Sequence, residues 1–371
     1  MNRSVVAISS LEDSKDALNE VVEKIRKNNI SPNLILFTSN CDDFYFYTKN
    51  LHEIFPESII LGTTSYINFN SEGFSHHGIS AFAICDGVEC SCGVLFEVSH
   101  FPKQYMGHIQ IALDELSSTE NTCCVEFCTA FSNGEELVLD TFEEVFENRK
   151  IQIFGSSSGN CLNNKQSMVS LNGECYQNSC VFAFIHNLEG RIFFYKENLY
   201  KPMGSIFSVT DIDVDSRTIY EFDDKPAADV IASALKIPLE ELGENLCSHP
   251  MGRIIGNKLY ITESDKIFPD GSISYFSQIY NRTKMALLEV CDFDVTWEKS
   301  KIEISKMIKK PSFSIVINCS ARSHLFEKNN KMEDFNKTLT NNYGQFFGIS
   351  GYGEQIDFLH LNQTMIIALF E

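Results

Sequence analysis

Basic residues are scarce in this sequence, and their scarcity excludes several classes of partner. Lys and Arg together number 30, against 50 Asp and Glu, so the formal net charge is −20 at pH 7. Nucleic acids and anionic lipid surfaces are both bound through a basic face of the protein. We therefore expect no nucleic acid and no membrane among the partners of this chain.

Long apolar runs are missing as well. No stretch approaches the roughly 20 apolar residues of a membrane helix, and the N-terminal sequence MNRSVVAISSLEDSKD becomes acidic before a signal-peptide core could form. The 13 cysteines are odd in number and lie mostly in apolar, strand-like runs, which favours reduced, buried thiols over a disulfide framework. We predict a cytoplasmic, globular protein, whose 371 residues suffice for two domains.

The sequence also lacks the common catalytic and metal-binding motifs. It contains no P-loop, and the glycines of GISGYGE have the wrong spacing for a dinucleotide-binding loop. Cys128 and Cys319 have neither nucleophile-elbow nor papain-like surroundings. His76 and His77 precede cysteines at 85, 90 and 92, but no second cysteine pair follows at zinc spacing. We expect neither an enzyme nor a metal site.

What the sequence does contain is a unit that occurs three times. Its copies begin at NLILFTS (33–39), CCVEFCT (123–129) and FSIVINCS (313–320). Each copy continues with an amphipathic helix pattern, a second apolar run and a third apolar run. The second run contains a glycine (Gly62, Gly155 or Gly348) followed by small, mostly hydroxylated residues. The spacing predicts a parallel strand pair with a crossover helix and an antiparallel return strand. We therefore predict an α/β fold of repeated β-α-β-β units, in which mixed sheets carry helices on their outer faces.

The region between the second and third copies has a different texture. Short strand-like runs occupy 190–197, 205–212, 258–267 and 272–279, and the sequence PDG between the last two predicts a hairpin. A helix is expected from Pro226 to Leu235, and further helices over 11–27 and 105–116. We expect the core to lie under the apolar stripes of these helices.

Several phrases occur in the order found in one known family. They are PNLILFTS, ILGTTS, FGSSSGN, KPMGSIFSVT, DDKPAADVI, SHPMG, PDGSI, INCSAR, GYGEQ and NQTMIIALF, and they span nearly the whole chain. In this respect the chain resembles FIST (F-box and intracellular signal transduction) proteins. The resemblance implies an N-terminal FIST domain over 1–215, with two of the repeats, and a C-terminal FIST domain over 216–371, with the hairpin region and the third repeat.

The resemblance also implies a function. FIST domains are proposed to sense small ligands such as amino acids, often within histidine kinases, chemoreceptors or nucleotide cyclases. No such output segment is visible here, so the implied partner is a separate signalling protein of one of these kinds. Some relatives are described as haem-binding nitric oxide sensors, which leaves haem as the alternative ligand and cofactor.

At several positions the sequence departs from the family pattern. Ile67 and Asn68 replace a glycine and an acid, and Asn160 replaces an aspartate. These changes remove negative charge from the presumed site, so we expect a ligand less cationic than that of a typical relative, or a lapsed site. Leu361 replaces the family's histidine and His360 stands one place early, which reverses its facing direction on a strand and weakens any haem ligation implied for it.

The hydroxyl-rich turns are the first candidates for a ligand site. Glycine allows close backbone approach, and exposed N–H groups in such turns can bind a carboxylate. Arg322 could hold a carboxylate through its planar fork, or could form a structural ion pair with Glu354. The turns could equally be ordinary tight turns. The predicted ligand-binding residues are Thr63, Thr64, Ser65, Ser156, Ser157, Ser158, Asn160, Arg322, Tyr352, Glu354 and Asn362.

Overall fold

Two compact units make up the chain in the computed structural model, which describes residues 4–27, 31–147, 149–159, 167–256 and 258–371. The first, here called the repeat unit, contains the residues up to Lys196 together with Lys301–Leu359 and Met365–Glu371. The second, here called the inserted unit, contains Glu197–Ser300 and His360–Thr364. The inserted unit therefore interrupts the repeat unit twice along the sequence.

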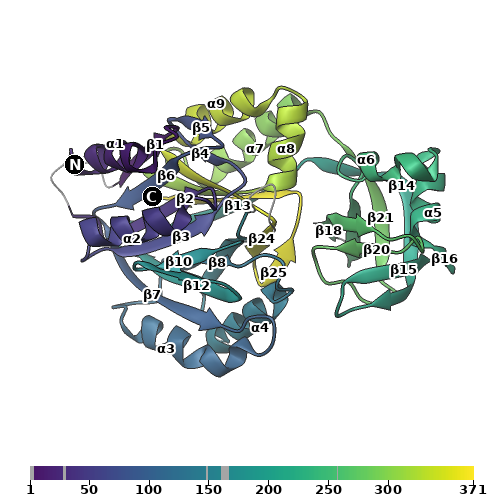
Figure 1. The fold of residues 1–371 in the computed structure, drawn as a ribbon, viewed down its shortest axis with the longest axis horizontal. Coiled ribbons are helices and arrows are strands. Elements are labelled where there is room, and N and C mark those ends of the chain that lie inside the picture. The colour runs from purple at the N-terminus through teal and green to yellow at the C-terminus, as the bar shows by residue number, and fades with distance from the viewer. Residues whose placement is uncertain (1–3, 28–30, 148, 160–166, 257) are drawn as a thin grey trace. The chain divides into compact units, whose positions relative to one another are not determined.

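Three six-stranded mixed sheets form the repeat unit, and their strands follow one order (Figure 1). The first sheet has the order β1 (Ser4–Ser9), β6 (Ile79–Ile84), β2 (Leu34–Ser39), β3 (Ile59–Thr64), β10 (Val169–Leu171) and β11 (Glu174–Tyr176). The second has the order β7 (Val88–Phe96), β12 (Ser179–Asn187), β8 (Thr122–Cys128), β9 (Gln152–Ser157), β24 (Gly353–Ile356) and β25 (Leu359–Leu361). The third has the order β13 (Ile192–Asn198), β26 (Thr364–Phe370), β22 (Phe313–Cys319), β23 (Phe346–Gly351), β4 (Asn68–Asn70) and β5 (Gly73–Ser75).

The predicted core of each repeat is confirmed. In the first repeat β2 and β3 are parallel, and β6 returns antiparallel to β2. The same pairings occur among β8, β9 and β12, and among β22, β23 and β26. The predicted crossover helices are present as α2 (Phe44–Ile54), α4 (Glu135–Phe146) and α9 (Met332–Tyr343). The third crossover also contains α8 (Ser320–Lys328), which the sequence pattern did not predict.

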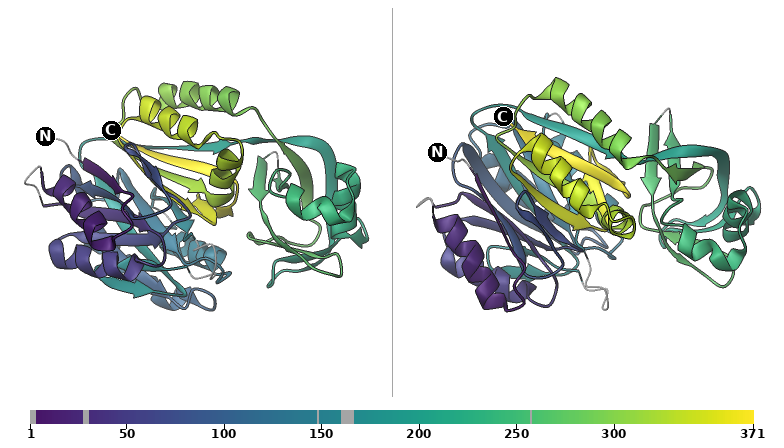
Figure 2. Two further views of the ribbon diagram at one scale, coloured as in Figure 1. Left: turned by 45° about the horizontal axis from the view of Figure 1, so that its top comes forward. Right: turned by 90° about the horizontal axis from the view of Figure 1, so that it is seen from above.

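Each repeat also begins with an edge strand (β1, β7 or β13), and an additional helix lies between that strand and the first strand of the repeat's core. The additional helices are α1 (Ser14–Arg26), α3 (Met106–Asp114) and α7 (Phe293–Met307). The first two confirm the helices predicted over 11–27 and 105–116, whereas α7 was not predicted. Val21 of α1 and Leu51 of α2 belong to one buried cluster with Ile35 of β2, so these helices cover one face of the first sheet (Figure 2). In the third repeat the inserted unit separates β13 from α7.

The hairpin of each repeat completes the sheet of a different repeat. The hairpin β4–β5 of the first repeat pairs with β23 of the third, and β10–β11 of the second repeat pairs with β3 of the first. The third repeat closes the cycle, since its β24 pairs with β9 of the second. Gly348 is required at one such crossing, because a Cβ there would collide with the Phe69 ring. This cyclic exchange explains why a turn of small residues follows the second strand of every repeat: there the chain leaves one sheet for another.

The inserted unit is an antiparallel sheet with short helices on one face. Its strands have the order β18 (Lys258–Thr262), β17 (Met251–Ile255), β21 (Lys284–Val290), β14 (Tyr200–Asp213), β15 (Thr218–Phe222), β20 (Ile273–Tyr275) and β19 (Ser264–Ile267), with β16 (Lys225–Pro226) beside β15. The helices are α5 (Ala227–Leu235) and α6 (Leu242–Asn245). Ile231 of α5 packs in one buried cluster with Phe222 and Leu287 of the sheet. The predicted PDG hairpin is confirmed, since it joins β19 to β20.

The cysteines are mostly as predicted, with one correction. Eleven cysteines of the described residues are free, and six of these are buried. Cys41 is disulfide-bonded, so the prediction of reduced thiols is wrong at this position; an odd cysteine count does not exclude a single bond. Within the described residues, no helix has both the length and the apolar character to cross a membrane.

Candidate functional site

The three hydroxyl-rich segments predicted as turns lie at the ends of β3, β9 and β23 and in the residues directly after them, so the prediction of turns is wrong for Thr63, Thr64, Ser156 and Ser157, which are strand residues. These segments, still called hydroxyl turns below, meet one another inside the repeat unit. The backbone N–H of Tyr66 donates to the carbonyl of Ser350 at 2.9 Å, and the N–H of Ser350 donates to Ser65 Oγ at 3.1 Å. Thr64 and Gly159 exchange two hydrogen bonds, of 2.6 Å from the Gly159 N–H to the Thr64 carbonyl and 2.7 Å from Thr64 Oγ1 to the Gly159 carbonyl. The first turn therefore contacts both of the others.

The second and third turns also contact each other directly. The backbone N–H of Tyr352 donates to the carbonyl of Ser157 at 3.0 Å, and Ser156 Oγ donates to the carbonyl of Gly353 at 3.3 Å. These contacts follow from the hairpin exchange, which carries the chain from β23 to the edge of β9. The three turns form one buried junction, and none of their predicted hydroxyl residues is more than 5% exposed: Thr63, Thr64, Ser65, Ser156, Ser157 and Ser158.

Arg322, in the first turn of α8, belongs to the same junction. Its side chain is fully buried, and Nε donates to Asn318 Oδ1 at 3.0 Å. Asn318 Nδ2 donates in turn to Ser323 Oγ at 2.9 Å, and Ser323 Oγ lies 2.9 Å from Ser350 Oγ. The guanidinium carbon lies 5.6 Å from the centre of the Phe326 ring. A chain of buried side chains thus connects Arg322 to the third hydroxyl turn, and protein encloses its guanidinium.

Tyr352 and Glu354 lie on either side of the point where β24 begins. Glu354 is fully buried and stands opposite Ser156 in the pairing of β24 with β9. Tyr352 is half-buried, and its ring centre lies 5.1 Å from that of Phe131. Tyr352 therefore reaches from the junction toward the loop after β8.

Asn362, another predicted residue, does not join this junction. Asn362 belongs to the inserted unit, where its Oδ1 accepts from Ser277 Oγ at 2.5 Å and from the N–H of Glu263 at 3.2 Å. His360 is buried in the same unit. Asn160 lies outside the described residues. The structure thus brings together nine of the predicted side chains and places Asn362 in the other unit.

A polar pocket of about 470 Å³ adjoins the second hydroxyl turn, at the carboxyl end of β8. The Ala130 N–H, on its wall, donates to Ser158 Oγ at 3.2 Å. Hydroxyl and amide groups dominate the lining, which consists of Ser99, Thr129, Ala130, Phe131, Ser132, Ser167, Gln177 and Asn178. None of these eight side chains is charged. Strand ends of this kind are frequent ligand sites in α/β proteins.

Hydrogen bonds within the protein hold the loops of this pocket in place. Ser132 Oγ donates to the carbonyl of Thr129 at 3.0 Å, and Ser167 Oγ donates to the carbonyl of Ala130 at 3.1 Å. Phe131 has a φ of 64°, in the left-handed region, so the loop turns sharply there. This pocket was not predicted from the sequence, although the polar run TAFSN that follows an apolar strand was a signal for it.

Glu126 is a second feature that was not predicted from the sequence. It lies in the middle of β8, is fully buried, and accepts from Cys180 Sγ at 3.2 Å through Oε2. Its other oxygen has no hydrogen-bond partner in the described residues. Burial raises the pKa of Glu126 to about 8, against the smaller effect of the Cys180 bond. A Cβ on Gly155 would lie 2.6 Å from Oε1, so this glycine leaves room for the carboxyl group.

The inserted unit contains its own buried carboxyl group, Glu263. Its Oε2 accepts from Gln363 Nε2 at 2.5 Å, and Gln363 Oε1 accepts from Tyr200 Oη at 2.7 Å. Burial raises the pKa of Glu263 to about 8, partly opposed by the bond from Gln363. These bonds attach the segment His360–Thr364 to the rest of the unit. An acidic residue in the short run ITES was the only sequence signal for this group.

The histidines considered for metal binding have other contacts. His76 Nε2 lies 2.6 Å from Glu327 Oε1, and its Nδ1 lies 3.2 Å from the carbonyl of Tyr66. Among the described residues, no group of three or more His, Cys, Asp and Glu side chains is arranged to hold a metal ion.

Comparison with known proteins identifies two domains of one family along the chain. The model of the FIST N domain matches residues 33–225, and that of the FIST C domain matches residues 227–357. A search of curated proteins found no match to the chain. The two matches meet near residue 226, whereas the compact units divide the chain elsewhere; the predicted division into 1–215 and 216–371 stays a prediction. FIST domains are associated with signal-transduction sensing, and because the two matches cover most of its length, the chain belongs to the FIST family.

Proposed function

We propose that the chain is a sensory ligand-binding protein that recognises a small polar metabolite, such as an amino acid, in the pocket at the carboxyl end of β8. The observation that carries this proposal is the lining of that pocket, in which hydroxyl and amide groups surround one aromatic ring. Its volume of about 470 Å³ lies within the range of small-molecule sites. The family's association with sensing supports the same conclusion.

The chemistry of the lining favours a neutral or zwitterionic ligand. Hydroxyl and amide groups orient a polar molecule through hydrogen bonds, and the Phe131 ring provides an apolar face. A carboxylate would be bound by backbone N–H groups of the loop, where Phe131 and Asn133 both have left-handed backbones. An ammonium group would find only uncharged acceptors, in keeping with the expected preference for a less cationic ligand.

The predicted hydroxyl turns support the wall of the pocket from the protein interior. Ser158 holds the pocket wall through Ala130, and Tyr352 holds it through the Phe131 ring. Ligand binding would select one arrangement of this loop, because occupancy shifts a conformational equilibrium only through differential affinity. The junction of turns would pass that change to the other repeats, and the output would go to a separate cytoplasmic signalling protein, such as a histidine kinase, chemoreceptor or cyclase.

A thermal-shift screen tests the proposal. The purified chain is heated with amino acids, small peptides and nucleosides, and a ligand at about 100 times its dissociation constant adds roughly 2.7 kcal/mol of stability. Ser132→Trp fills the pocket from its half-buried rim, and Ser132→Ala is the matched control that leaves it open. We expect hits that persist in Ser132→Ala and disappear in Ser132→Trp.

Two results would contradict the proposal. Hits that remain unchanged in Ser132→Trp would place the ligand elsewhere. If no compound of a broad library stabilises the protein, the proposal of a metabolite ligand is wrong. The optical spectrum of the purified protein tests the haem alternative, which predicts a Soret band after addition of haemin.

A further inference from the structure

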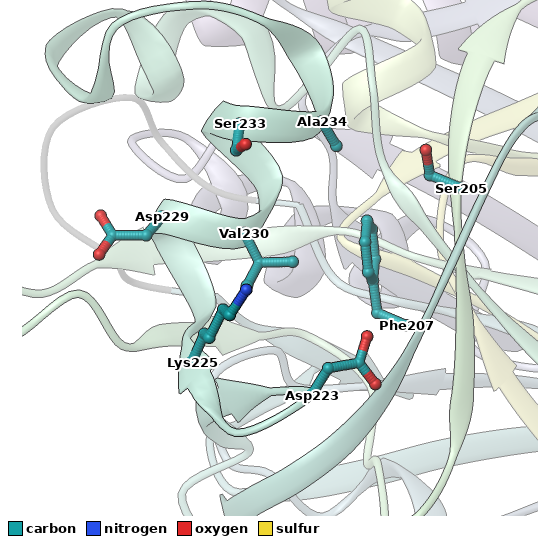
Figure 3. Close-up of a pocket in the computed structure, with 8 residues that line it drawn as sticks. All are labelled: Ser205, Phe207, Asp223, Lys225, Asp229, Val230, Ser233 and Ala234. Carbon is teal, nitrogen blue, oxygen red and sulfur yellow. The ribbon is translucent and has the colours of Figure 1, made fainter.

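A second pocket, of about 540 Å³, lies within the inserted unit between β14 and α5 (Figure 3). Its apolar wall consists of the Phe207 ring, Val230 and Ala234. Three charged side chains, Asp223, Lys225 and Asp229, also line it. All three are exposed.

The pocket occupies a place where the sheet lacks a strand. β14 pairs with β15 only from Val209 to Asp213, although on its other side it pairs with β21 along much of its length. β15 ends at Phe222, and the chain then turns away through Asp223 and Asp224, whose φ angles are 49° and 61°. Upstream of Val209, no described strand lies on the β15 side of β14.

The backbone of β14 exposes hydrogen-bonding groups on this open side. The Ser208 N–H donates to Asp223 Oδ1 at 3.0 Å, and the Ser208 carbonyl accepts from the Asp223 N–H at 2.9 Å, so the peptide groups of Ser208 point away from β21. Successive residues of a strand alternate in direction. Ile206 therefore directs its own N–H and carbonyl toward the open side, and its side chain is 53% exposed.

We propose that an extended peptide segment of a partner protein adds to β14 beside Ile206. Its backbone would continue the sheet where β15 leaves it, a known mode of peptide recognition at free sheet edges. One apolar side chain of the peptide would enter between Phe207 and Val230. The next residue on the same face, two positions along, would lie near Asp223 and Asp229, whose two negative charges against one lysine favour a basic side chain.

The shape of the edge favours a peptide over a second copy of this chain. The pairing of β14 with β21 is interrupted between Pro202 and Ile206, and Pro202 has no N–H to donate. The open edge is therefore short, and strand pairing along it would bury far less surface than a stable dimer interface does. A folded strand would also have to enter between β14 and α5, where a single extended segment suffices. The inference concerns the inserted unit alone and does not depend on the proposed metabolite site.

The probe for the test is a fluorescein-labelled peptide, Thr-Leu-Thr-Lys-Thr-Leu-Thr, in which leucine and lysine share one face. We expect saturable binding to the full chain by fluorescence anisotropy, with slower amide exchange at Ile206 in the complex. Asp229→Lys reverses one pocket charge and should weaken binding about tenfold. Asp224→Lys makes the same exposed change outside the pocket lining and should have little effect. A peptide N-methylated at its central lysine and its neighbours loses backbone donors and should not bind.

Four results would overturn the proposal: no binding of the probe, binding that the N-methylated peptide retains, equal losses in the two charge variants, or no change in exchange at Ile206. Protection of Ile206 that increases with protein concentration in the absence of peptide would assign the edge to a second copy instead. Displacement of the peptide by a small metabolite, without protection of Ile206, would assign the pocket to a small molecule and would likewise contradict strand addition.

Discussion

The second repeat differs from the first and third at one equivalent position of the sheet. Opposite the glycine of each second strand, the first strand carries Phe37, Glu126 or Val316. All three side chains are fully buried. Burial at this position stabilises the apolar side chains of phenylalanine and valine. A carboxyl group at the same position loses its hydration, which costs free energy.

The three repeats have the same strand order, but only the second carries a carboxyl group at this buried position. The polar pocket adjoins the same repeat that contains the buried carboxyl group. Ser158 contacts the pocket wall, and Ser157 Oγ donates to Glu135 Oε1 at 3.3 Å, at the start of α4. The charge on Glu135 in turn helps to raise the pKa of Glu126, after the larger effect of burial. The proposed ligand site therefore adjoins the repeat that also contains the buried carboxyl group.

The largest expected effect comes from moving the carboxyl group into another repeat. Val316→Glu places it at the equivalent position of the third repeat, where we expect a loss of about 4 kcal/mol in the free energy of unfolding at pH 7.5, because a buried charge has no prepared surroundings there. Urea denaturation measures the loss. Val316→Thr, close in volume, is the control, and a loss below about 1 kcal/mol for the Glu variant would break the comparison.

The next effect is the pH dependence that Glu126 gives to stability. Its pKa of about 8 in the folded protein exceeds the ordinary value of 4.5, so the folded state binds the proton more tightly. Stability should therefore fall as the pH rises from about 4.5 to about 8, and change no further above that. In Glu126→Gln, the decrease in the free energy of unfolding between pH 4.5 and pH 7.5 should be smaller by about 3 kcal/mol.

Unfolding curves between pH 4.5 and 8.5 test this prediction. Glu263, whose pKa is also raised to about 8, contributes a fall of the same sign, so a slope remains in the single variant. Glu263→Gln combined with Glu126→Gln should flatten the profile further. An unchanged slope in Glu126→Gln would show that this carboxyl group is not held protonated.

A smaller effect is expected on ligand selectivity. Asn178→Asp adds a negative charge to the pocket, and Asp can still accept the bond from the Ser99 N–H, which is 3.0 Å in the structure. We expect ligands with an unpaired ammonium group to bind up to about tenfold more tightly and simple carboxylates to bind more weakly. Calorimetry with the hits of the thermal screen measures both changes. Equal affinities for the two classes would mean that the pocket does not contact charged groups.

The smallest effect concerns the outside of the second repeat. Lys103 Nζ lies 2.6 Å from Glu144 Oε2, and both side chains are exposed. Lys103→Ala should leave the urea midpoint of unfolding unchanged within experimental error, because solvent screens exposed ion pairs. A clear decrease of that midpoint would show that this surface ion pair stabilises the second repeat.

The repeats could be predicted from the sequence because their apolar runs and glycine turns are local signals. The exchange of hairpins could not, since β4, β10 and β24 are only three or four residues long and pair with strands of other repeats. The same exchange buries Ser65 and Ser156 in a junction, so residues chosen for their chemistry turned out to be enclosed. Phe131 and Ser132 line the pocket through a loop conformation that no periodicity encodes.

A crystal structure of the chain with the strongest hit of the thermal screen tests the central claim most directly. We predict ligand density beside Thr129 and Phe131, at the end of β8, and none at the corresponding ends of β2 and β22. Density at either of those strand ends, or in the pocket of the inserted unit alone, would contradict the assignment of ligand binding to the second repeat.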